Sequence, residues 1–189
     1  MKILIINNDD KKVRLIRKFL KLEKCDSEVV NYKRCKKHVD KDISGLIISG
    51  SPHHATITMP YEKDLILDAV QKKIPVLGIC GGHQVLGLLF GGKVGNHKKP
   101  VKGYYKIKFM KRRCIFNELP EKLSIMFESH RNYVTLPKSF ELLGTSTKTK
   151  NEAMKMKRKS VYGVQFHPEM SGYLGEIIFK NFCNICKVK

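Results

Sequence analysis

The sequence has no long apolar run and no segment typical of a secretion signal. No stretch approaches the roughly 18 apolar residues that a transmembrane helix needs, so we expect no contact with a membrane. Residues 1–7 contain no small-residue cleavage site and fit a first strand better than a signal peptide. We therefore expect a cytoplasmic protein. Its 189 residues, 42% of them hydrophobic, suffice for a single domain over residues 1–189 with a sizeable core.

Patterns typical of disulfides and metal centres are also missing. The six cysteines are scattered without a framework, which favours free thiols in a cytosolic protein. Cys183 and Cys186 form a lone C-x-x-C, but no further ligands with zinc-binding spacing lie nearby. We expect this pair to pack on a C-terminal helix, and we predict no metal site.

Acidic residues are scarce, with 17 Asp and Glu against 37 Lys and Arg, giving a formal net charge of +20. Such a balance could attract nucleic acid or an acidic partner protein. The basic runs are short, however, and lack the arginine and aromatic pattern of single-strand binders. We therefore interpret the charge as a solvated lysine-rich surface, with an acidic partner protein as the alternative, and we expect no nucleic-acid binding.

One stretch, residues 74–84, places a cysteine where a reactive thiol is expected. An apolar run to Ile79 is typical of a strand buried on both faces, and Val85 and Leu86 continue as a helix. Cys80 therefore sits at a strand-to-helix turn, and the glycines beside it allow the tight backbone of a nucleophile elbow. The helix N-terminus favours the thiolate. Alone, such a cysteine would more often be a small core residue.

A second buried-strand pattern, residues 161–166, ends in His167-Pro168-Glu169. Pro168 disfavours a helix at His167, so His167 and Glu169 can lie together at a strand end. An imidazole that is held by a carboxylate and placed against a thiol is a nucleophile, base and orienting group. Each motif is weak alone, but both together favour a nucleophilic cysteine over a cysteine that only packs in the core.

These two motifs resemble the signatures of class I glutamine amidotransferases, Gly-Ile-Cys-x-Gly-His-Gln and Gln-Phe-His-Pro-Glu. The resemblance extends over nearly the whole chain. It implies that Cys80 is the nucleophile, His167 the general base and acid, and Glu169 the orienting carboxylate. The implied reaction hydrolyses the side-chain amide of glutamine through a thioester and supplies ammonia to a synthetase.

Backbone N–H groups near Cys80 are candidates for stabilising the oxyanion that forms during attack on an amide. One is Gly81, the residue after the nucleophile, and the other is the Gly50-Ser51 turn. The family usually has glycine where Ser51 stands, so a left-handed backbone there would distort the oxyanion site. The resemblance further implies that the Gln84 amide contacts glutamine.

A loop containing Ser129 and His130 would then hold the α-amino and α-carboxylate groups of the substrate. In this loop and downstream of it, the chain most resembles the glutaminase subunit of two-subunit GMP synthetases, although Arg131-Asn132 replaces the usual Gly-Asp. This implies a separate ATP-pyrophosphatase subunit that aminates xanthosine monophosphate. ATP and Mg²⁺ would bind to that partner and no cofactor to this chain, which has no phosphate-binding glycine motif and ends soon after its last helix.

Three other functions stay open from the residues. The same triad could serve anthranilate or aminodeoxychorismate synthase, or it could belong to a free-standing γ-glutamyl hydrolase. A catalytically weak basic binding module is the third alternative.

Alternating strand and helix patterns predict an α/β fold, with a mostly parallel central sheet and helices on both faces. Shorter strands between residues 93 and 156 predict a smaller antiparallel portion, and residues 61–72 predict a helix. In such sheets ligands bind at the carboxyl ends of the strands. Gly50, Cys80 and His167 all follow predicted strands, so we expect them to converge on one crevice.

Overall fold

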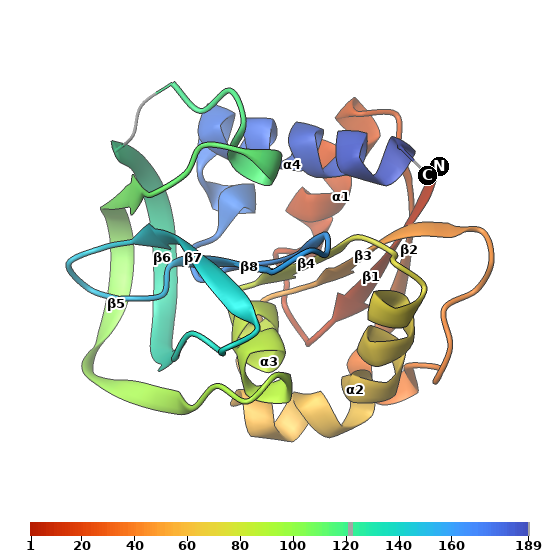
Figure 1. Cartoon of the computed structure of the whole chain (residues 1–189), viewed down its shortest axis with the longest axis horizontal. Helices are drawn as coiled ribbons and strands as arrows, with labels where there is room; N and C mark the ends of the chain where they lie inside the picture. Colours follow the sequence, from red (N-terminus) through yellow and green to blue (C-terminus); the bar gives the residue numbers. More distant parts are fainter. Residues whose placement is uncertain (121–122, 189) are drawn as a thin grey trace.

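The computed structural model describes residues 1–120 and 123–188, and within them nine strands form one sheet (Figure 1). The strand order is β2-β1-β3-β4-β9-β8-β7-β5-β6. The parallel part contains β1 (Lys2–Asn7), β2 (Asp26–Asn31), β3 (Ile43–Ile48), β4 (Val76–Ile79) and β9 (Val161–Val164). The antiparallel part contains β5 (Val94–Phe109), β6 (Leu123–Val134), β7 (Phe140–Thr145) and β8 (Ala153–Met156). The predicted α/β class is therefore confirmed.

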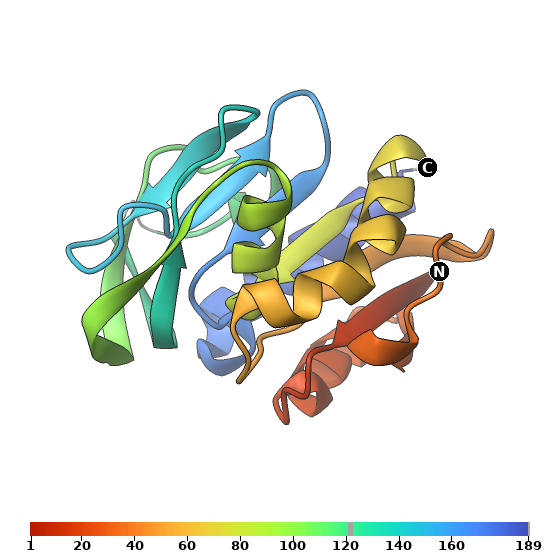
Figure 2. The same cartoon turned by 90° about the horizontal axis from the view of Figure 1, so that it is seen from below.

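Four α-helices cover the two faces of the sheet in the described residues. They are α1 (Val13–Leu22), α2 (Ala55–Gln71), α3 (Gly81–Leu89) and α4 (Gly172–Lys187). Helices α1 and α4 lie on one face, and α2 and α3 lie on the other (Figures 1 and 2). Each face has its own apolar cluster, because the central strands point alternate side chains into opposite layers. None of the described helices is long and apolar enough to span a membrane.

The antiparallel part curls back onto the end of β9 (Figure 1). Phe127, on the edge strand β6, forms an isolated bridge with His167, and the His167 N–H donates to the Phe127 carbonyl at 2.8 Å. A short 3₁₀ turn, η3 (Pro168–Met170), follows this bridge, and two others are η1 (Tyr32–Arg34) and η2 (Cys114–Phe116). The curl carries the middle of β6 toward the carboxyl ends of the parallel strands.

Two local predictions were wrong. Helix α2 begins at Ala55 rather than Tyr61, because the His54 side chain accepts from the Thr56 N–H and caps an earlier start. Pro60 lies inside the helix, where its missing N–H removes one backbone hydrogen bond without ending it. Ser129 and His130 lie within strand β6 rather than in a loop, because β5 pairs with this segment through Val101 and Lys102.

Candidate active site

Cys80 occupies a strained turn between β4 and α3. Its φ of 49° and ψ of −99° lie where residues other than glycine rarely occur, at a cost of about 1–3 kcal/mol. The turn is tight because nearby glycines let backbones touch: a Cβ on Gly82 would lie 2.4 Å from the Ile48 carbonyl oxygen, and one on Gly78 would lie 2.5 Å from that of Gly82. Cys80 is 4% exposed, and this geometry places it on the wall of a cavity at the carboxyl end of β4, where a nucleophile elbow presents its reactive atom.

His167 and Glu169 form a buried pair at the end of β9. The His167 Nδ1 and Glu169 Oε1 atoms are 2.6 Å apart, and the two residues are 1% and 4% exposed. The carboxylate accepts from Nδ1–H, which leaves Nε2 for the thiol side. Burial alone would lower the pKa of His167, but the charges of Cys80 and Glu169 outweigh it and hold that pKa well above its ordinary value. The ring therefore favours the imidazolium form.

Cys80 and His167 line one cavity of about 390 Å³ at the carboxyl ends of the parallel strands. Its wall is made by nine residues, namely Asp9, Asp10, Lys11, Lys12, Ser51, Pro52, Cys80, Ser129 and His167. A larger cavity of about 580 Å³ near His97 and Leu142 has no cysteine in its wall. The smaller cavity is the candidate active site, because it alone of the two combines a thiol with an imidazole.

Backbone donors for an oxyanion lie close together beside Cys80. Gly81 is the first residue of α3, so its N–H has no acceptor within the helix. A Cβ on Gly81 would lie 2.8 Å from the Ser51 nitrogen, which places the two backbones side by side. The φ of Ser51 is not positive, so its side chain strains nothing, and its Oγ accepts from the His53 N–H at 2.9 Å. At Gly50 a Cβ would lie 2.4 Å from Asp10 Oδ2, so a side chain has no room.

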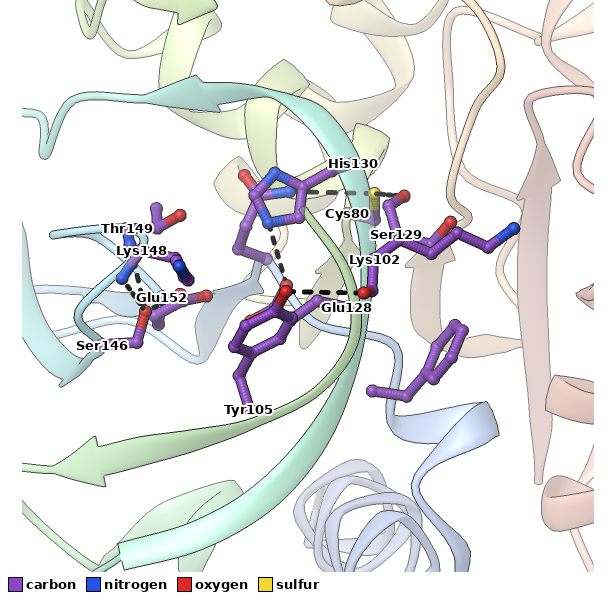
Figure 3. A network of polar contacts seen from close by, with 12 residues as sticks. Cys80, Lys102, Tyr105, Glu128, Ser129, His130, Ser146, Lys148, Thr149 and Glu152 are labelled. Atoms are coloured by element: carbon purple, nitrogen blue, oxygen red, sulfur yellow. Dashed lines mark hydrogen bonds and ion pairs between the residues drawn. The ribbon is translucent and has the colours of Figure 1, made fainter. Parts of the chain in front are cut away.

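Of the remaining predicted substrate-binding residues, one lies on the cavity wall and two have side chains that contact other parts of the protein. Ser129 lies on the cavity wall, and its carbonyl accepts from the Cys80 Sγ at 3.8 Å (Figure 3). Gln84 is buried, and its Nε2 donates to the carbonyl of Asn132 at 2.8 Å and to the side chain of Gln165. The His130 ring faces Glu128 inside the curled sheet. The structure therefore brings Ser129 to the cavity wall, but not the side chains of Gln84 or His130.

The site residues that sequence reasoning missed are Gln165 and five residues of the cavity wall, namely Asp9, Asp10, Lys11, Lys12 and Pro52. The Gln165 Nε2 contacts the Cys80 sulfur at 3.7 Å. Asp10 and Lys12 lie on the cavity wall and form a 2.9 Å ion pair. Asp10 follows β1 at the same sheet edge as Gly50 and Cys80, so the rule for strand ends could have identified it.

One group in the described residues has the composition of a cation site. Asp10, His167 and Glu169 are buried and offer ligand atoms within 4.8 Å of one another. The hydrogen bond between His167 and Glu169 uses one ligand atom of each side chain, Nδ1 and Oε1. A cation bound through either of these two atoms would have to break that bond, whereas the bond itself suits proton transfer.

Comparison with known proteins shows similarity to glutamine amidotransferases. Residues 4–185 match the family model described as glutamine amidotransferase class-I. A glutamine-hydrolysing GMP synthase subunit of Methanocaldococcus jannaschii is 35% identical, covering 99% of this chain and 98% of its own. The corresponding GMP synthase subunit of Methanococcus vannielii is 37% identical with the same coverage.

Solved structures share the fold over almost the entire chain. A crystal structure from Thermoplasma acidophilum, assigned to a GMP synthase subunit, superposes with a TM-score of 0.89 and 27% identity. It covers 99% of this chain and 94% of its own. A glutamine amidotransferase from Thermotoga maritima superposes with a TM-score of 0.79 at 23% identity, covering 90% of this chain and 76% of its own, and shows the fold alone. The chain therefore belongs to the class-I glutamine amidotransferase family.

Proposed function

We propose that this chain is the glutamine-hydrolysing subunit of a GMP synthase and supplies ammonia to a separate synthetase subunit. The observation that carries the proposal is the meeting of Cys80 with the His167–Glu169 pair in one cavity. The relatives named as glutamine-hydrolysing GMP synthase subunits match over nearly their full length, which favours this pathway over anthranilate or aminodeoxychorismate synthesis.

The first chemical step forms a thioester. The Cys80 thiolate attacks the side-chain carbonyl carbon of glutamine, and the N–H groups of Gly81 and Ser51 stabilise the oxyanion. The C–N bond then breaks as the His167 Nε2–H donates its proton to the departing nitrogen, which leaves as ammonia. Glu169 holds the imidazole in the orientation and tautomer that this transfer needs.

The second step releases glutamate. Neutral His167 takes a proton from water, the resulting hydroxide adds to the thioester carbonyl, and the C–S bond breaks. The sulfur leaves as a thiolate beside the imidazolium, which restores the starting state. Glutamine and water are thus converted to glutamate and ammonia with no cofactor on this chain.

The acceptor reaction belongs to the partner. We assign activation of xanthosine monophosphate, with ATP and Mg²⁺, to an ATP-pyrophosphatase subunit, and we place the complex in the cytoplasm. Coupling of the two reactions predicts that glutamine hydrolysis is slow in the isolated chain and faster when the partner is present.

The test compares glutamate release by the wild type, Cys80→Ala and Cys35→Ala, each with and without the synthetase subunit. Cys35 is half-buried and lies outside the cavity wall, so it is the matched control. We expect stimulation by the partner in the wild type and Cys35→Ala, and no activity in Cys80→Ala. Full turnover without any partner would contradict the coupled arrangement, and residual turnover in Cys80→Ala would contradict the nucleophile.

A further inference from the structure

Two buried carboxyl groups face each other inside the curled sheet. Glu128 comes from β6 and Glu152 from the residue before β8, and both are fully buried. Their side chains lie within hydrogen-bonding contact of each other. The Ser146 hydroxyl donates to Glu152 Oε1 at 2.5 Å. Both oxygens of Glu128 and the Oε2 of Glu152 have no hydrogen-bond donor among the described residues.

Among the groups around this pair, the imidazolium of His167 is a counter-charge that lowers the pKa of Glu128, but burial outweighs it. His130, also on β6, places its Nε2 3.0 Å from Glu128 Oε2, but the contact is not directed as a hydrogen bond. Burial lowers the pKa of His130, which favours the neutral ring. The other polar or titratable groups that Figure 3 shows in this network come from β5 and the turn after β7: Lys102, Tyr105, Ser146, Lys148 and Thr149. His97 on β5 packs against the His130 ring, and the charge of His167, at the end of β9, acts on Glu128. Of the two lysines, Lys148 lies over the Tyr105 ring and both are exposed.

A proton shared by Glu128 and Glu152 explains how two carboxyl groups can lie side by side in the interior. Two adjacent carboxylates cannot both ionise in a dry interior, because burial and mutual repulsion each disfavour the second charge. Burial raises the pKa of Glu128 to about 7. Burial and then repulsion by Glu128 raise the pKa of Glu152 to about 9. One proton between the two groups supplies the missing hydrogen-bond donor, and at neutral pH the pair carries at most one negative charge.

The pair connects the two backbone segments that surround the catalytic sulfur. Glu128 lies directly between Phe127, whose carbonyl holds the His167 N–H, and Ser129, whose carbonyl contacts the Cys80 sulfur. On the other side, the Glu152 carbonyl accepts from the Gln165 N–H at 2.8 Å. The Gln165 side chain reaches the same sulfur. Any force that separates Glu128 from Glu152 therefore acts on both contacts of Cys80.

The geometry points to Glu128 and Glu152 as a positioning pair, in which one shared proton holds β6 against the β8–β9 side of the curl and so fixes the surroundings of Cys80. Loss of that proton at alkaline pH puts a second charge into the interior and loosens β6. The effect on catalysis rests on the proposed glutaminase function, whereas the shared proton itself does not.

The first experiment detects the proton without using activity. Infrared spectra of the whole protein between pH 6 and pH 10 should show the carbonyl band of a protonated carboxylic acid that persists above pH 8, where Glu62, whose pKa burial raises to about 7, is largely ionised. Glu152→Gln should lose this band. The matched control is Glu141→Gln, because Glu141 pairs with Lys111 and Arg113, which hold its pKa below its ordinary value. Absence of the band in the wild type above pH 8, or its persistence at that pH in Glu152→Gln, would overturn the proposal.

The second experiment tests positioning. The amide that Glu152→Gln introduces keeps a hydrogen-bond donor toward Glu128 at every pH, so this variant should retain kcat at pH 7 within about twofold and lose less of it by pH 9 than the wild type. Glu152→Ala removes the donor and should lower kcat roughly tenfold with a smaller change in KM. If glutamine is not hydrolysed, the rate at which iodoacetamide alkylates Cys80 replaces kcat. An alkaline loss in Glu152→Gln equal to that of the wild type would overturn the positioning role.

Discussion

At the scale of single residues, the sulfur of Cys80 is held by contacts from opposite directions. The Ser129 carbonyl accepts from it, and the Gln165 amide donates to it. His167 faces the same cavity with its other nitrogen bound to Glu169. Because every one of these partners is buried or backbone, the reacting groups are preorganised before substrate binds.

Glu169→Gln keeps a hydrogen-bond acceptor near His167 but removes its charge. We expect kcat to fall roughly 10²-fold or more, because general acid and base catalysis by a positioned side chain accelerates a reaction by about 10²–10⁴-fold. Glu169 helps to raise the pKa of His167, so its loss should lower that pKa. The imidazolium then deprotonates at a lower pH, so the alkaline decrease of kcat/KM in its pH profile should begin at a lower pH. Glu176→Gln, at an exposed position of α4, is the control. If the alkaline decrease of kcat/KM in Glu169→Gln occurs at the same pH as in the wild type, Glu169 does not raise the pKa of His167.

Gly81→Ala tests the proposed oxyanion donors. The new methyl group would lie 2.8 Å from the Ser51 nitrogen and 2.7 Å from its Cβ, so the Gly50-Ser51 turn must move away. Displacing one donor costs about 10²–10³ in kcat, and we expect a loss toward the lower end of that range. Steady-state kinetics give the result, and circular dichroism checks the fold. If the variant folds and its kcat is unchanged, the backbone N–H of Ser51 is not an oxyanion donor.

At the scale of elements, the sequence patterns predicted the strands of the parallel part of the sheet most clearly. Strand β1 lies within the expected residues 1–7, and the elbow between β4 and α3 lies where the apolar run meets glycine. Strands β1, β3, β4 and β9 are largely buried on both faces, so their sequences are mostly apolar runs, whereas the edge strand β2 is mostly polar and partly or fully exposed along its length. The side-chain placement of His130 could not be predicted, because strand β6 alternates direction and turns it inward, away from the cavity.

The buried carboxyl pair was also beyond sequence reasoning. Glu128 and Glu152 meet only through the curl of the antiparallel strands, and nothing in their local patterns marks either as buried. The meeting of Gly50, Cys80 and His167 was predictable by contrast, because parallel strands end at a common edge. Sequence reasoning thus located the cavity but not the interior that supports it.

The pair makes a prediction about stability. The pKa of Glu152 is raised from 4.5 to about 9, so between these values the folded state holds a proton that the unfolded chain has lost. Its contribution is therefore full below about pH 4.5 and falls as pH rises toward 9. Glu152→Gln does not titrate, so its free energy of unfolding relative to the wild type should rise by about 1 kcal/mol or more between pH 5 and pH 9. Urea unfolding at both pH values measures this, and a constant difference would contradict the raised pKa.

At the scale of the whole molecule, the net charge of +20 concerns partners rather than the fold. If the synthetase presents an acidic face, complex formation should weaken as salt screens the attraction. We expect the partner concentration for half-maximal stimulation to rise several-fold between about 50 and 300 mM salt, since the Debye length shortens over this range. The KM for glutamine should change little, because glutamine carries no net charge. A salt-independent requirement for partner would show that the surface charge plays no part in assembly.

Cysteine labelling tests the central claim most directly, because the chain contains six free thiols and the account selects one. The protein is treated with a glutamine analogue that carries an electrophilic carbon, and peptide mass spectrometry locates the adduct. The account predicts one adduct on Cys80, lost in Cys80→Ala, slowed in His167→Ala and prevented by excess glutamine. An adduct on any of the other five cysteines, or labelling of Cys80 that glutamine does not prevent, would contradict it.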